Sequence, residues 1–156
     1  MTPTDQHQRL WVFEGTWSGD ETLYPAPWDE AGGTARGTLV YRKAVHGRFM
    51  VSDYVEEQDG RVVFEGHGVY GYDADRDVYT MFWFDPSGGG GPAAPLPGRW
   101  AGETLTFERT SPRARYVYRF DGPERVTFSV EHAPEGGELR PLLVGRYARV
   151  KASQAP

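Results

Sequence analysis

Short segments in which apolar or aromatic residues alternate with polar ones recur along the whole chain. This period-two pattern is typical of β-strands with one buried face. It predicts about ten strands, at residues 17–24, 35–45, 48–56, 61–72, 77–85, 98–100, 103–110, 115–120, 125–132 and 142–150. Turn residues such as Asp59-Gly60 and Asp121-Gly122-Pro123 separate neighbouring segments, so most strands are expected to pair as antiparallel hairpins.

A helical pattern occurs only before the first strand. Thr4 is a suitable N-cap for a short helix with an apolar face at Leu10, Trp11 and Phe13, and this helix is expected to plug or flank one end of a barrel. No later segment is suited to the long helix of a parallel crossover, and closing the meander into a barrel removes exposed strand edges. The Gly- and Pro-rich segment Pro86–Pro97 is expected to be a rim loop or flap that gates the open end.

The composition fits one domain over residues 1–156, with a core at about 6–150 and a tail at 151–156. Aromatic residues form 14% of the chain and hydrophobic residues 38%, which suits either a semi-polar cavity wall or a thick sheet. The net charge of −5 and scattered basic residues argue against nucleic-acid binding. There is no cysteine, no signal-like apolar segment and no apolar run near the ~20 residues of a membrane span, so a cytoplasmic protein without membrane association is expected. A homodimer is left open.

Five motifs occur in order along the chain: Gly15-Thr16-Trp17, Gly47-Arg48-Phe49, Gly71-Tyr72-Asp73, Trp83-Phe84-Asp85 and Gly145-Arg146-Tyr147. In their order and spacing the chain resembles a lipocalin-like bacterial family, the domain of unknown function 1579, in the calycin group of barrels. The resemblance covers roughly residues 6–150. It implies an all-β, up-and-down antiparallel barrel with an internal ligand site, while the family itself has no established activity.

The resemblance also implies a structural role for the first motif. In lipocalins and their relatives, the Trp of this motif packs across one barrel end against an Arg of the last strand. Here Trp17 would therefore meet Arg146 or Arg149, in a cation–π contact of about 0.5–2 kcal/mol.

A small, partly apolar molecule is the expected ligand, with aromatic rings supplying contact area and charged groups fixing its orientation. The expected cavity wall consists of Tyr41, Phe49, Val51, Asp53, Glu65, His67, Tyr79, Trp83, Arg115 and Tyr118. A phase error of one residue would exchange these inward sets for the alternative ones, such as Met50, Ser52 and Tyr54.

Two other functions remain open. The first is a cyclase- or isomerase-type enzyme that uses Asp53, Glu65 or His67 as an acid or base in the cavity. Residues 66–71 match the pattern G-x-G-x-x-G, but a turn follows instead of a helix, so no dinucleotide site is expected.

The second alternative is a haem protein. Nitrobindins, another barrel family in the calycin neighbourhood, hold haem through a single histidine, which makes His132 or His67 the candidate ligand. The residues after Trp17, Ser18-Gly19-Asp20, depart from the nitrobindin pattern. The four histidines also lack the spacing that places two rings on one face, so neither a metal nor another cofactor is expected.

Overall fold

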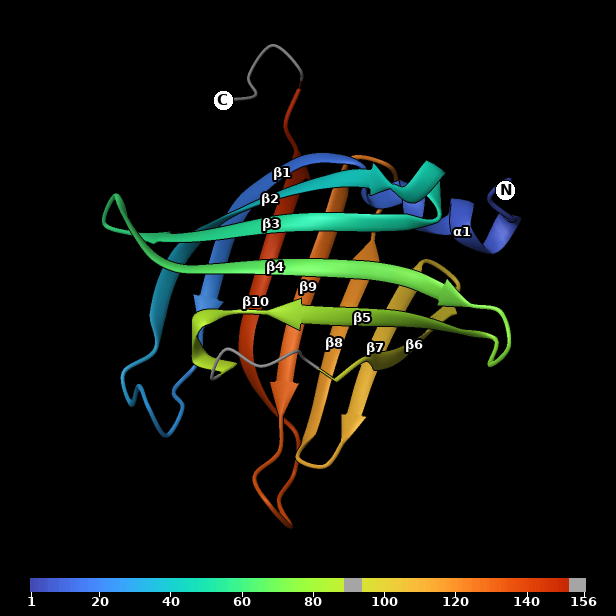
Figure 1. Cartoon of the computed structure of the whole chain (residues 1–156). Coiled ribbons are helices and arrows are strands. Elements are labelled where there is room, and N and C mark those ends of the chain that lie inside the picture. Colours follow the sequence, from blue (N-terminus) through green and yellow to red (C-terminus); the bar gives the residue numbers. More distant parts are fainter. Residues whose placement is uncertain (89–93, 152–156) are drawn as a thin grey trace.

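Ten antiparallel strands follow one another around a closed sheet. The structure is a computed structural model that describes residues 1–88 and 94–151. Each strand pairs with its neighbours in the sequence, and β1 pairs with β10, so the sheet closes into a barrel (Figure 1). The strands are β1 (Gly15–Leu23), β2 (Gly33–Ala44), β3 (Phe49–Gln58), β4 (Arg61–Asp73), β5 (Val78–Phe84), β6 (Leu96–Ala101), β7 (Thr104–Thr110), β8 (Arg113–Phe120), β9 (Arg125–His132) and β10 (Arg140–Arg149).

The predicted all-β antiparallel barrel is therefore confirmed, and each predicted strand has a counterpart. The segment Pro86–Pro97 differs from the prediction at both ends. Pro86–Gly88 forms a 3-10 turn, η3, and β6 already begins at Leu96. Residues 89–93 of this segment lie outside the described residues, so its role as a gate stays a prediction.

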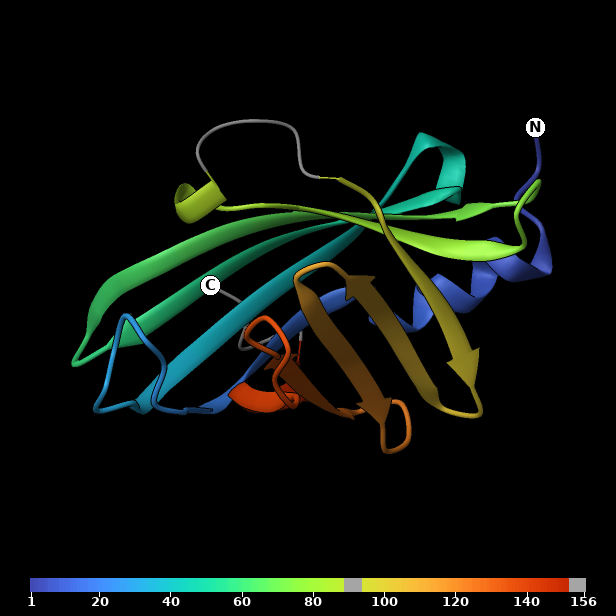
Figure 2. The ribbon, with the colours of Figure 1, turned by 90° about the horizontal axis from the view of Figure 1, so that it is seen from below.

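The two ends of the barrel are built differently. The helix α1 (Asp5–Arg9) and the 3-10 turn η1 (Leu10–Phe13) lie at the end where β1 begins, and a further 3-10 turn, η2 (Val45–Gly47), connects β2 to β3 there. The β1–β2 and β3–β4 connections lie at the opposite end (Figure 2). We call these the closed end and the open end. Strands β3–β5 run across β7–β10 in Figure 1, as in an orthogonally packed sheet.

Trp17 and Arg149 hold the closed end together. They are direct partners across β1 and β10, and the Arg149 guanidinium carbon lies 4.3 Å from the centre of the Trp17 ring. The same guanidinium donates to the carbonyl oxygens of Val12, at 3.0 Å, and Glu14. The Trp17 contact predicted for Arg146 or Arg149 is confirmed for Arg149, because Arg146 faces solvent opposite Asp20.

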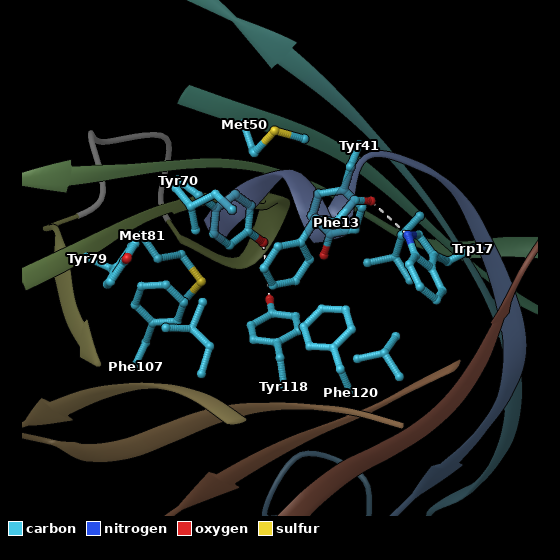
Figure 3. Packing of buried hydrophobic residues seen from close by; sticks show 14 of the residues in the cluster. Phe13, Trp17, Tyr41, Met50, Tyr70, Tyr79, Met81, Phe107, Tyr118 and Phe120 are labelled. Carbon is cyan, nitrogen blue, oxygen red and sulfur yellow. Dashed lines mark hydrogen bonds between the residues drawn. The ribbon is translucent and has the colours of Figure 1, made fainter. Parts of the chain in front are cut away.

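An aromatic core fills the barrel next to the closed end. Phe13 projects from η1 between four other rings (Figure 3), with ring centres 5.0–5.9 Å away in Tyr41, Tyr70, Tyr118 and Phe120. The Tyr70 and Tyr118 hydroxyls lie 3.1 Å apart within this core, at hydrogen-bond distance. Since the core occupies only one part of the interior, the remaining space lies toward the open end.

Candidate functional site

A cavity of about 450 Å³ lies between the aromatic core and the open end. This volume is in the range of sites for small molecules. Its apolar and aromatic lining consists of Leu23, Tyr24, Ala26, Trp28, Leu39, Tyr54, Val63, Phe64, Met81, Trp83, Tyr116, Tyr118, Phe128, Val130, Leu142 and Leu143. Its other lining residues are Asp29, Glu56, Gln58 and Asp85. The cavity wall is thus mainly apolar, with a few carboxylates.

The inward phase of β3 is the opposite of the predicted one. Met50, Ser52, Tyr54 and Glu56 are buried inside the barrel. The intervening residues, Phe49, Val51 and Asp53, are on the outer face. Both faces of β3 carry apolar residues, so hydrophobicity alone does not indicate which face is inside. On the outer face, Phe49 packs against Gly71 of β4.

The ten predicted wall residues fall into three groups. Trp83 and Tyr118 line the cavity, although ligand binding by them stays a prediction. Tyr41 and Tyr79 are buried in the aromatic core outside the cavity lining. The other six side chains are on the outer face, contrary to the expected wall: Phe49, Val51, Asp53, Glu65, His67 and Arg115.

The outward charged residues pair with one another at the surface. Asp53 Oδ1 lies 2.9 Å from His67 Nδ1, and Asp53 Oδ2 accepts from Arg42 at 2.8 Å. The hydrogen bond with His67 is the main reason that the pKa of Asp53 is lowered. Arg115 pairs with Glu108 and Glu131 on the neighbouring strands. Asp53, Glu65 and His67 therefore do not reach the cavity as acid or base groups.

The residues of the cavity do not fit a haem held by a histidine. His67 is on the outer face, and His132, at the end of β9, is not part of the cavity lining. In residues 1–88 and 94–151, no group of three or more His, Asp or Glu side chains is arranged to hold a metal ion.

Two buried glutamates form the polar part of the site, together with two tyrosines. Glu21 of β1 is 1% exposed and Glu56 of β3 is 8% exposed. The Tyr54 hydroxyl lies 2.8 and 2.9 Å from the two Glu21 carboxylate oxygens and 3.0 Å from Glu56 Oε2. The Tyr147 hydroxyl donates to Glu21 Oε1. We call Glu21, Tyr54, Glu56 and Tyr147 the buried acid network.

Burial raises the pKa of both carboxyl groups in this network. The pKa of Glu21 rises from 4.5 to about 7, mainly through burial, with a smaller contribution from the charge of Glu56. Hydrogen bonds from Tyr147 and Tyr54 act in the opposite direction. Burial also raises the pKa of Glu56. Both tyrosines keep their protons, because burial raises their pKa values as well.

A count of protons agrees with these directions. The network has contacts between Tyr147 and Glu21, between Tyr54 and Glu21, and between Tyr54 and Glu56. Each phenol supplies one proton, so two protons serve three contacts. The third contact becomes a hydrogen bond when one carboxyl group is protonated, so the network favours holding one additional proton.

Two glycines make room for this site. A Cβ at Gly37 of β2 would overlap the Glu21 carboxylate, and a Cβ at Gly66 of β4 would overlap the Trp83 indole. Gly66 is part of the match to G-x-G-x-x-G. Its position in a strand, against the Trp83 ring, accounts for a glycine there, so no dinucleotide-binding role is needed.

For Glu21, the phase of β1 is a signal within the sequence itself. Residues two and four positions apart in a strand share a face, so the inward position assigned to Trp17 also requires an inward Glu21. For Glu56, the signal depended on the phase of β3, which the pattern left open. Glu56 follows Tyr54 on the alternative face.

These features define a class of protein: a closed antiparallel β-barrel with a plugged end and an internal cavity that contains buried acids. The chain belongs to the family described as protein of unknown function (DUF1579), whose model matches residues 2–149. No curated protein matches the chain.

Solved structures support the fold. The crystal structure of Rv2717c from M. tuberculosis is similar with a TM-score of 0.74 and 17% identity, and the match covers 96% of this chain and 99% of that one. EF1p2_mFAP2b bound to DFHBI has a TM-score of 0.50 and 17% identity, with 92% and 98% of the two chains covered.

In the described part of the chain, no helix has the length and hydropathy needed to cross a membrane.

Proposed function

We propose that this protein binds a small, partly apolar molecule in the cavity of the barrel. The cavity itself is the main support, because about 450 Å³ of space remains in an otherwise tightly packed interior. Protein interiors normally leave few voids larger than a water molecule. A space of this size with a mainly aromatic and aliphatic wall is typical of a ligand site.

The open end offers access to this space. Trp28, in the β1–β2 connection, lines the cavity and is 72% exposed, and Val63 of β4 lines it while remaining half exposed. Large apolar side chains that are both exposed and part of a cavity wall suit the entry of a hydrophobic molecule. The similar barrel EF1p2_mFAP2b holds the small molecule DFHBI, which agrees with this proposal.

The test is a titration with Nile red, a neutral dye whose emission changes in apolar surroundings. Val130→Trp places a large side chain in the cavity, and Val117→Trp makes the same change on the outward face of the neighbouring strand β8. We expect Val130→Trp to weaken dye binding at least about tenfold, while Val117→Trp and His67→Ala keep the parental affinity. Equal dye binding by the two Trp variants, both folded by circular dichroism, would refute binding in the cavity.

The alternative functions have weaker support. An acid or base role in the cavity would fall to Glu56, because Asp53, Glu65 and His67 face outward. The histidine-ligated haem alternative finds no support in the cavity, because no histidine is among the described side chains of its wall.

A further inference from the structure

The cavity contains acids without accompanying bases. Its charged lining residues are Asp29, Glu56 and Asp85, and Glu21 lies directly behind Glu56 through the shared Tyr54 hydroxyl. Among the described residues, no Arg, Lys or His lines the cavity. A ligand with a carboxylate or phosphate would therefore place its charge beside buried acids and find no cation there.

Two of the three lining carboxylates already have local partners. Asp85 accepts from Trp83 Nε1 at 2.9 Å and from the backbone nitrogen and hydroxyl of Ser87. Asp29 lies within 3.2–3.3 Å of two backbone nitrogens in its own turn, those of Ala31 and Gly32. These contacts explain both side chains without a ligand.

Glu56 differs from them, because one of its oxygens is available inside the cavity. Its side chain is more than nine-tenths buried and lines the cavity. Oε2 lies 3.0 Å from the Tyr54 hydroxyl, while Oε1 has no hydrogen-bond partner in residues 1–88 and 94–151. Oε1 is not one of the fully buried, unpartnered side-chain atoms of the described residues, so it is accessible from the cavity. A donor on a ligand in the cavity can therefore reach it.

Aromatic side chains line the cavity near Glu56. The Tyr54 ring centre lies 6.1 Å from that of Phe64 and 6.2 Å from that of Trp83, and Phe64 is the direct partner of Glu56 across β3 and β4. All three rings line the cavity. A carboxylate in a wall that also contains several aromatic rings is an environment that favours an organic cation, through ion pairing and cation–π attraction.

We propose that the cavity ligand carries a protonated amine that pairs with Glu56 and an apolar or aromatic body that fills the rest of the space. This inference rests on the proposed ligand-binding function. The ammonium group would donate to Glu56 Oε1 and compensate the charge of the carboxylate, and Tyr54, Phe64 and Trp83 would contact its carbon atoms.

Isothermal titration calorimetry at pH 8 with three probes of equal chain length tests this inference: octylamine, octanol and octanoate. An alkylamine is protonated at this pH. We expect octylamine to bind at least about tenfold more tightly than octanol, and octanoate to bind most weakly. Glu56→Gln should reduce the ratio of amine to alcohol affinity to about threefold or less. Asp53→Asn, which removes an outward carboxylate from the same strand, should leave the ratio unchanged.

The outcomes separate this inference from the proposed function. Equal affinities for the three probes, or tightest binding of octanoate, would overturn the amine preference even if Glu56→Gln did not fold. Nile red binding that depends on Val130 would still support the cavity as a ligand site. A preference for octylamine that persists in folded Glu56→Gln would also contradict the assigned role of Glu56.

Discussion

The buried proton on Glu21 predicts that the protein loses stability as the pH rises through neutrality. In the unfolded chain this carboxyl group has its ordinary pKa of 4.5, whereas in the folded barrel its pKa is about 7. Between these values the folded state binds more protons than the unfolded state. The free energy of unfolding therefore decreases with rising pH in this window.

The size of the effect follows from the two pKa values. One pKa unit corresponds to about 1.4 kcal/mol, so a rise from 4.5 to about 7 gives a loss of about 3 kcal/mol between pH 4.5 and pH values above 7. Such a loss is a large part of the roughly 5–15 kcal/mol that stabilises an ordinary domain. Glu56 acts in the same direction, because burial raises its pKa too.

His7 contributes to the pH dependence of stability with the opposite sign, so its effect must be distinguished from that of Glu21. Burial and the nearby charge of Arg48 lower the pKa of His7, so the unfolded state binds more protons at this residue below pH 6.5 and stability rises with pH there. A comparison of the parent with Glu21→Gln removes this contribution, since both proteins contain His7. The amide oxygen of Gln still accepts hydrogen bonds from Tyr54 and Tyr147.

Urea denaturation followed by tryptophan fluorescence at pH 5, 6, 7 and 8 measures the difference. We expect the parent to lose about 2.5 kcal/mol relative to Glu21→Gln between pH 5 and pH 8. Asp20→Asn, at the neighbouring outward position of β1, should keep the parental pH dependence. If Glu21→Gln shows the same slope as the parent, the reasoning from the buried proton is refuted.

Two further substitutions test the packing around the site. Trp17→Ala should cost about 3–5 kcal/mol in urea denaturation, because it removes a fully buried ring and the Arg149 contact from the closed end; a change below about 1 kcal/mol would contradict the closure role. Gly37→Ala should cost about 1–3 kcal/mol, because the new methyl group overlaps the Glu21 carboxylate, and an unchanged urea midpoint would show that the carboxylate is not held there.

The sequence was sufficient for the barrel because each strand carries its own local signal. Alternation marks the strand, a turn residue marks its end, and the hairpin pairs it with the next strand. Closure between β1 and β10 is not a local feature, so no local pattern predicts it. The resemblance to a known family predicts it instead, through a contact between Trp17 and an Arg of the last strand. Arg149 lies directly opposite Trp17, which distinguishes it from Arg146.

The cavity wall was less predictable because it depends on strand phase. On β5 the inward set was correct, since Tyr79, Met81 and Trp83 are all large and share one face. On β4 the inward positions are occupied partly by Gly66 and Gly68, which serve as surfaces for side chains from other strands. On β4, therefore, the side-chain pattern alone favoured the face of Glu65 and His67 as the cavity wall, although this face is the outer one.

The placement of Glu21 and Glu56 is costly if only the fold is considered. An apolar pair of similar size would avoid the desolvation of two carboxyl groups, and Gly37 gives up a side chain to leave space for one of them. Tyr54 and Tyr147 compensate only part of that cost, since two phenol protons serve three contacts. In the proposed ligand complex, the unpartnered oxygen of Glu56 is where the remainder would be recovered, because a donor that enters through the open end would complete the network. Proposed ligand binding and the pH dependence of stability would then both arise from the same buried carboxyl groups.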